Sequence, residues 1–157
     1  MPVVESSLVV PVPVEVAFDV SQTTGAIRLR WDPFIRKQWF EGGVTKPGKG
    51  VRTVTVHRSG LRMVTEYVSY HRPTNVGMTM ITGSWFFERL AGGWHFDAVT
   101  ADSTRAVWKY NFACWPRWLA PIAERIGAVI LQRDIDRRIA GFARGCADPV
   151  VLAAVRP

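Results

Sequence analysis

The longest stretch with a helical pattern of apolar residues runs from Trp118 to Cys146, about seven turns of helix. Its apolar positions form one stripe of Leu119, Ile122, Ile126 and Ile130, followed by a second of Leu131, Ile135, Ile139, Phe142 and Cys146. At about 100° per residue, the second stripe lies roughly half a turn around the helix from the first. The helix therefore either bends near Gly127 or faces two different surroundings. We expect its C-terminal half to pack on a sheet and its N-terminal half to close over a cavity, a partner or a membrane surface.

Most of the remaining chain alternates between apolar and polar residues, which is the period of a half-buried strand. The segments that we predict as strands are 3–10, 37–43, 51–58, 61–71, 75–82, 93–101 and 104–114. Short turn sequences such as Ser59-Gly60 separate them, so we expect hairpins and an antiparallel meander. For residues 83–90, a strand extension and a loop both remain open.

Two short helices are expected between the first two strands. The first begins near Pro13 and ends near Gly25, and the second spans residues 26–30. Pro33 then forces Asp32 out of helical geometry. The tail after Cys146 is predicted to be irregular.

The last two strands carry aromatic residues on one face. Trp94 and Phe96 share one side of their strand, with His95 and Asp97 on the other. In the next strand Trp108, Tyr110 and Phe112 share one side. An aromatic sheet face covered by one helix requires either a filled core or an enclosed pocket.

Length and composition predict one globular domain over residues 1–157, with 48% hydrophobic and 21% charged residues. No apolar run approaches the roughly 20 residues of a membrane span. The N-terminus carries Glu5 and no basic region, so we expect no signal peptide, a cytoplasmic location and reduced cysteines. Cys114 and Cys146 do not have metal-ligand spacing, and we expect neither a metal nor a cofactor.

The net charge of +7 favours acidic partners such as anionic lipid, RNA or an anionic ligand. The 20 basic residues are spread along the chain, without a specific nucleic-acid signature. An ordinary solvated surface is the alternative, and Arg125, Arg133, Arg137 and Arg138 are assigned to a solvated helix face.

The order of these elements and several short motifs indicate a family. The motifs are Val12-Pro13-Val14-Glu15-Val16-Ala17-Phe18, Trp31-Asp32-Pro33, Val64-Thr65-Glu66-Tyr67, Gly92-Gly93-Trp94-His95-Phe96 and Ser103-Thr104-Arg105-Ala106-Val107. Over roughly residues 3–146 the chain resembles the START/Bet v 1-like (SRPBCC) superfamily, in particular its polyketide cyclase/dehydrase and lipid-transport branch.

The resemblance implies an α+β helix-grip fold. In this fold a curved antiparallel sheet of about seven strands wraps around a long C-terminal helix, and two short helices follow the first strand. The resemblance also implies a cavity for a hydrophobic small molecule such as a lipid, quinone or polyketide. Some members catalyse aromatisation or cyclisation, but no universal catalytic residue can be carried over, and fold alone does not assign function.

We predict a ligand cavity between the sheet and the helix, while a filled core remains the alternative. Its predicted lining is Met78, Met80, Trp94, Phe96, Trp108, Tyr110 and Phe112 from the strands and Ile122, Ile126 and Ile130 from the helix. Glu66 can pair with Arg52 or Arg62 on a neighbouring strand. If these side chains point inward, they place a polar pair in the cavity, and otherwise they form an ion pair on the surface. The strand 61–71 can face inward with Val64, Glu66 and Val68 or with Met63, Thr65 and Tyr67.

No catalytic residue can be assigned from the sequence. His95 and Asp97 can pair, but on the face opposite the aromatic residues. We therefore predict a carrier or sensor of a hydrophobic small molecule. A polyketide aromatase/cyclase and a protein- or RNA-binding module that uses the basic surface remain alternatives, and oligomeric state stays open.

Trp115 and Trp118, with Arg117 between them, allow two interpretations. They are either buried where the last strand meets the helix or form an interfacial anchor for transient contact with an anionic membrane.

Overall fold

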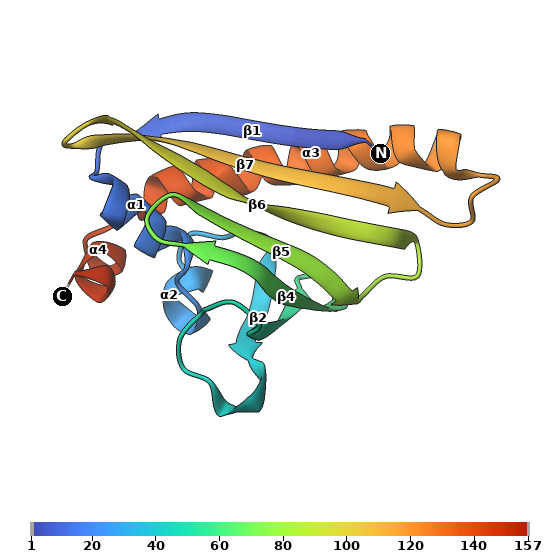
Figure 1. The fold of residues 1–157 in the computed structure, drawn as a ribbon, viewed down its shortest axis with the longest axis horizontal. Helices are drawn as coiled ribbons and strands as arrows, with labels where there is room; N and C mark the ends of the chain where they lie inside the picture. Colours follow the sequence, from blue (N-terminus) through green and yellow to red (C-terminus); the bar gives the residue numbers. More distant parts are fainter. Residues whose placement is uncertain (1, 157) are drawn as a thin grey trace.

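The computed structural model describes residues 2–156 and contains one sheet of seven antiparallel strands with helices at its concave side and at one end (Figure 1). The strands are β1 (Val3–Val10), β2 (Ile35–Phe40), β3 (Arg52–His57), β4 (Arg62–His71), β5 (Asn75–Thr82), β6 (Phe87–Thr100) and β7 (Ser103–Cys114). The helices are α1 (Val14–Ser21), α2 (Gly25–Leu29), α3 (Ala120–Gly145) and α4 (Pro149–Val155), with a 3₁₀ turn at Glu41–Gly43.

The strand order is β1-β7-β6-β5-β4-β3-β2, so all neighbours but β1 and β7 are consecutive hairpin partners. In Figure 1, α3 runs along β1 and β7, while the other strands curve away from it toward β2. The curl carries β3–β5 away from the helix, whose main sheet contacts are with β1 and β7. This arrangement confirms the predicted α+β helix-grip fold.

The long helix is uninterrupted, so its two apolar stripes face different surroundings instead of marking a bend. Its C-terminal half buries Ile135, Ile139 and Phe142 against the core. Its N-terminal half approaches the sheet through the small residues Ala123 and Gly127. A Cβ at Gly127 would lie 3.1 Å from Cε2 of Phe112, so this position favours glycine or a slight shift of the ring.

The core lies between the C-terminal half of α3, α1 and the aromatic faces of β6 and β7. Trp94 stacks on Trp108 with ring centroids 4.1 Å apart and also contacts Phe142 at 4.7 Å. His95 and Asp97 lie on the exposed face, as the alternation predicts, with His95 Nε2 3.1 Å from Asp97 Oδ1. The sequence pattern therefore assigned the two faces of β6 correctly.

Three elements differ from the prediction. The strand predicted at 37–43 ends at Phe40, and the strand predicted to begin at residue 93 begins at Phe87, leaving residues 83–86 as a loop. The prediction of an irregular tail is wrong. Asp148 caps α4 by accepting a hydrogen bond from the Val150 amide at 2.9 Å, and Val151 is buried.

Candidate functional site

A cavity of about 370 Å³ lies between the curled part of the sheet and the C-terminal half of α3. Most of its wall is apolar, and methionine and aromatic side chains are prominent. The apolar lining includes Phe34, Met63, Val76, Met78, Met80, Leu90, Trp94, Trp108, Ile130 and Leu131. The main lining residues with polar groups are Arg28, Gln38, Thr55, His57, Thr65, Tyr67, Tyr110, Asp134 and Arg138. A ligand held here would contact mainly hydrophobic surface.

The orientation of β4, which the sequence left open, is decided by the cavity lining. Met63, Thr65 and Tyr67 face the cavity. Glu66 is on the other side, where its Oε1 lies 3.9 Å from Nε of Arg52 and both side chains are partly exposed. Glu66 therefore forms the surface ion pair rather than the cavity group that we considered.

The predicted lining residues fall into three groups. Met78, Met80, Trp94, Trp108, Tyr110 and Ile130 all line the cavity. Phe96 and Phe112 are instead fully buried in the core. Ile122 and Ile126 are exposed by 62% and 56%, so their expected position over the cavity is corrected. The cavity meets α3 only from Ile130 onward, because the preceding turns lie against β7 through small residues.

A buried cluster of charges closes one end of the cavity. The carboxylate of Asp32 is fully buried and accepts hydrogen bonds from two arginines. Arg28 donates through Nε at 2.9 Å, and Arg138 donates through Nη2 at 2.8 Å and Nε at 3.1 Å. The guanidinium of Arg138 also lies between the rings of Phe34 and Trp108, 4.4 and 4.3 Å from their centroids. The cluster links α2, the chain before β2, and α3.

The carboxylate of Asp32 and the two guanidinium groups shift one another's pKa values. Burial acts to raise the pKa of Asp32, but Arg138 and Arg28 outweigh it and hold that pKa at about 2. Burial acts to lower the pKa of Arg138, and the neighbouring Asp32 and Tyr110 outweigh it and raise that pKa. Burial lowers the pKa of Arg28, but a guanidinium keeps its proton at neutral pH, so all three side chains are charged.

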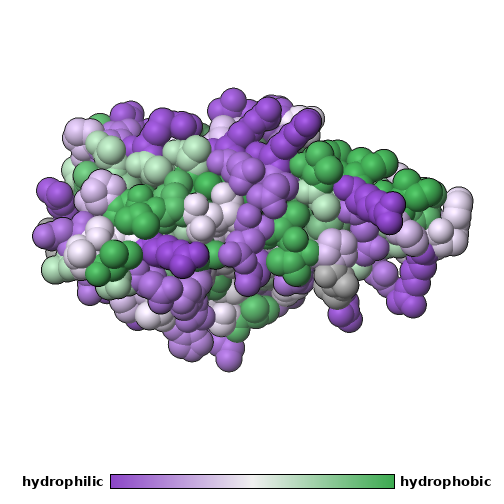
Figure 2. Space-filling view, turned by 90° about the horizontal axis from the view of Figure 1, so that it is seen from above, coloured by the Kyte–Doolittle hydropathy of each residue, from purple (hydrophilic) through white to green (hydrophobic). Residues whose placement is uncertain are grey.

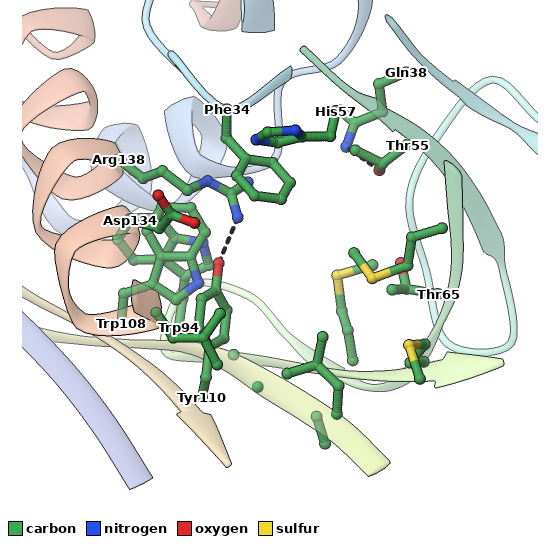
Figure 3. Close-up of a pocket in the computed structure, with 18 of the residues that line it drawn as sticks. Phe34, Gln38, Thr55, His57, Thr65, Trp94, Trp108, Tyr110, Asp134 and Arg138 are labelled. Carbon is green, nitrogen blue, oxygen red and sulfur yellow. Dashed lines mark hydrogen bonds between the residues drawn. The ribbon is translucent and has the colours of Figure 1, made fainter. Parts of the chain in front are cut away.

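Tyr110 brings a polar group from this cluster into the cavity (Figure 3). Its hydroxyl oxygen accepts a hydrogen bond from Nη1 of Arg138. Burial raises the pKa of Tyr110, against the effect of Arg138, so the phenol keeps its proton. Among residues 2–156 this proton has no acceptor, and it can be donated to an oxygen of a ligand.

Asp134 lies one turn before Arg138 on α3 and also lines the cavity (Figure 3). It is close enough to contribute to the raised pKa of Arg138. Within the described part of the chain its carboxylate has neither an ion-pair nor a hydrogen-bond partner. Donor and acceptor groups therefore converge at this end of the cavity.

The far wall offers a second polar group. Gln38 Nε2 donates to Oγ1 of Thr55 at 3.2 Å, while Oε1 of Gln38 is buried and has no partner within residues 2–156 (Figure 3). His57 lies beside Phe34, with ring centroids 4.4 Å apart. A ligand that spans the cavity can thus meet polar groups at both ends and apolar side chains between them.

The sequence did not identify the charged cluster. Arg138 was assigned to a solvated helix face, but it is only 8% exposed, so this assignment is wrong. Two signals were available. Arg28 and Asp32 have the i, i+4 spacing of an intrahelical ion pair, and Arg138 lies between Ile135 and Ile139 of the buried stripe. Neither signal shows that the two arginines share one carboxylate.

Residues 2–156 contain no group of three or more His, Cys, Asp or Glu side chains that could hold a metal ion. In the same range no helix is both long and apolar enough to span a bilayer, and the cytoplasmic location stays a prediction. Cys114 and Cys146 are free and buried, and burial raises the pKa of the Cys146 thiol to about 12.

Solved structures with similar folds cover nearly the whole chain. A protein from Thermus thermophilus is 16% identical, with a TM-score of 0.74 and coverage of 99% of this chain and 100% of that one. The Zhui aromatase/cyclase from a Streptomyces species is 14% identical, with a TM-score of 0.74 and coverage of 95% of each chain. A START superfamily protein from Mycobacterium smegmatis is 13% identical, with a TM-score of 0.70 and coverage of 90% and 97%. At these identities the similarity shows the fold alone.

A comparison with curated proteins gave no match. The family model described as polyketide cyclase/dehydrase and lipid transport matches residues 1–146, nearly the full length of the chain. This match agrees with the resemblance in the sequence motifs and with the helix-grip architecture. The chain belongs to the polyketide cyclase/dehydrase and lipid transport family.

Proposed function

We propose that this protein binds a hydrophobic small molecule, as a carrier or sensor, in the cavity between β3–β6 and the C-terminal half of α3. The observation that carries the proposal is the cavity itself, about 370 Å³ of space bounded mainly by apolar side chains. Met63, Met78 and Met80 line one side, and thioether side chains adapt to the shape of different ligands. A filled core would have left no such space.

A polar group in the cavity limits the chemical class of ligand that it can bind. The Tyr110 proton is available to an acceptor on the ligand. A hydrophobic molecule with a carbonyl oxygen at this end of the cavity satisfies the donor. Quinones and polyketides carry such oxygens, and a lipid carries them in its head group.

Titration with the uncharged apolar probe N-phenylnaphthylamine tests the binding proposal. We expect saturable fluorescence enhancement with one probe per protein, and displacement of the probe by long-chain lipids, quinones or aromatic polyketides. A folded protein that gives no enhancement would contradict the proposal.

Replacing Tyr110 with phenylalanine is expected to weaken binding of a ketone selectively. The variant should bind acetylnaphthalene roughly fivefold more weakly than the wild type does, the value of about one hydrogen bond. Binding of ethylnaphthalene, which has the same shape without the oxygen, should change much less. Comparing the two ligands removes any general effect of leaving Nη1 of Arg138 without its acceptor. Equal losses for both ligands would show that Tyr110 does not donate to the ligand.

A polyketide aromatase/cyclase is a second candidate, and one arrangement favours it. Cyclisation of a poly-keto chain requires a base to take a proton from carbon and a donor for the enolate oxygen that forms. Asp134 is a carboxylate without an ion-pair partner in the described residues, and the Tyr110 hydroxyl lies at the same end of the cavity. One of the structures with a similar fold is an aromatase/cyclase, which is compatible with this chemistry.

Replacing Asp134 with asparagine separates the two candidates. For an enzyme we expect turnover of a synthetic polyketone to fall by roughly 100-fold while probe affinity is retained, since the substitution removes the base and keeps the shape. Turnover would be followed by the absorbance of the aromatic product. A wild-type protein that binds polyketones without converting them would exclude the enzyme and leave the carrier.

The third alternative, a protein- or RNA-binding module, has less support. Several arginines are already in ion pairs with carboxylates, including Arg30 with Asp148, Arg72 with Asp19 and Arg117 with Glu88. The cavity is a more specific feature than the overall basic charge.

A further inference from the structure

The N-terminal half of α3 carries an apolar face that nothing in the described chain covers. This outer apolar face consists of Trp85, Trp118, Ile122, Ile126, Val129 and Ile130. Trp118 and Trp85 are exposed by 82% and 74%. In Figure 2, hydrophobic side chains gather toward the end of the molecule where this half of α3 lies in Figure 1. Contiguous exposed apolar surface of this kind marks an interaction site.

The exposed apolar residues of α3 lie on one side of the helix. Ile122, Ile126, Val129 and Ile130 recur every three or four residues and therefore share one side of α3. The opposite side already packs against β7 through Ala123 and Gly127. The loop before β6 joins the face through Trp85, whose ring lies 6.2 Å from that of Trp115. Two separate parts of the chain thus place tryptophan at the same end of the molecule.

The charged residues around the outer apolar face indicate which kind of partner binds there. Arg125 and Arg133 are exposed on α3 beside the apolar stripe, and Arg117 extends from the preceding turn with an exposed side chain paired to Glu88. With Glu88 and the nearby Glu124 included, the three arginines still leave this border net positive, as is the whole chain at +7. In a two-fold pair of α3 helices the same arginines would meet each other. An anionic bilayer instead offers negative charge at its surface and hydrocarbon beneath it.

The face also continues into the cavity. Ile130 belongs to the outer apolar face and to the cavity lining, and Leu131 and Asp134 in the next turn line the cavity as well. Ser84 and Phe87, on either side of the loop that carries Trp85, reach the same cavity. A hydrophobic molecule could therefore pass from a bilayer to the cavity without crossing water.

We propose that the outer apolar face docks on anionic membrane surfaces, with Trp85 and Trp118 at the depth of the head groups and the isoleucines of α3 in the outer hydrocarbon. The docking stands on the exposed face and its basic border. The further step, that the cavity exchanges its ligand with the docked membrane, rests on the proposed function.

Flotation with lipid vesicles tests the docking. The wild-type protein should float with vesicles of phosphatidylcholine and phosphatidylglycerol, more weakly with phosphatidylcholine alone, and less as salt is added. The double variant Ile122→Ser/Ile126→Ser should lose roughly tenfold or more in vesicle affinity. Val9→Ser/Val99→Ser is the matched control, because both valines are exposed and lie outside the face, and it should bind as the wild type does.

The outcomes separate this proposal from the binding of a ligand. N-phenylnaphthylamine titration of Ile122→Ser/Ile126→Ser should be unchanged, since neither side chain lines the cavity. Equal flotation of the two double variants would overturn the docking proposal. The proposal would also be overturned if the wild-type protein did not bind vesicles but sedimented as a dimer, and Ile122→Ser/Ile126→Ser sedimented as a monomer. The face would then bind a second copy of the chain. Vesicle binding without probe binding would retain the docking and contradict the proposed function.

Discussion

Replacing Asp32 with alanine will lower the free energy of unfolding by about 3–5 kcal/mol. The carboxylate is fully buried and is the shared acceptor of Arg28 and Arg138. Without it, two guanidinium groups remain close together in the interior with no opposing charge of their own. Denaturant unfolding of the purified variant measures the loss.

Asp19→Ala provides the matched control. Asp19 accepts two hydrogen bonds of 2.8 Å from Arg72, so its contact geometry is comparable, but both side chains are partly exposed. Exposed ion pairs contribute about 0–1 kcal/mol, and the control should lose no more than that. Equal losses of unfolding free energy in the two variants would mean that burial does not make the Asp32 cluster more stabilising than an exposed ion pair.

The same cluster predicts how stability responds to acid. The pKa of Asp32 is about 2 in the folded protein, below its ordinary value of 3.8. Its contribution is therefore fully present above about pH 4 and is lost as the pH falls toward 2. The loss from this group is about 2 kcal/mol. The stability difference between the wild type and Asp32→Asn should shrink over this range, and a constant difference would contradict the low pKa.

Replacing Thr65 with tryptophan will abolish or strongly weaken ligand binding, with an expected increase in Kd of more than about tenfold. Thr65 lines the cavity from β4, and an indole there occupies space that a ligand would use (Figure 3). The side chain is added into empty volume, so the protein should remain folded. N-phenylnaphthylamine titration and the thermal unfolding midpoint measure the two effects.

Glu66→Trp is the control from the adjacent position of the same strand. Glu66 is on the outer face, where it pairs loosely with Arg52, and a tryptophan there points away from the cavity. This variant should bind the probe as the wild type does. If Glu66→Trp blocked binding and Thr65→Trp did not, the ligand would lie on the outer face of the sheet.

The sheet and its inner face could be predicted because each follows from local rules. Alternation of apolar and polar residues placed Trp94 and Phe96 inside and His95 and Asp97 outside, as the structure has them. Turn sequences defined the hairpins. For β4 the alternation is ambiguous, because both faces carry apolar residues, and the inward face depends on the curl of the whole sheet.

The charged end of the cavity could not be predicted, because it depends on contacts between distant parts of the chain. Asp32 and Arg138 are 106 positions apart, and only the folded chain shows that they pair. The stripe of Ile122 and Ile126 was recognised, but a stripe shows only that one side of a helix is apolar. Whether it faces a cavity or the outside depends on where the small residues on the opposite side bring the helix against the sheet.

The most direct test of a ligand cavity is a crystal structure of the protein saturated with N-phenylnaphthylamine. We predict density for one probe molecule between β3–β6 and the C-terminal half of α3, in contact with Thr65 and within reach of the Tyr110 hydroxyl. Density for the probe only on the outer apolar face, with the cavity unchanged, would contradict the account and make this protein a surface binder.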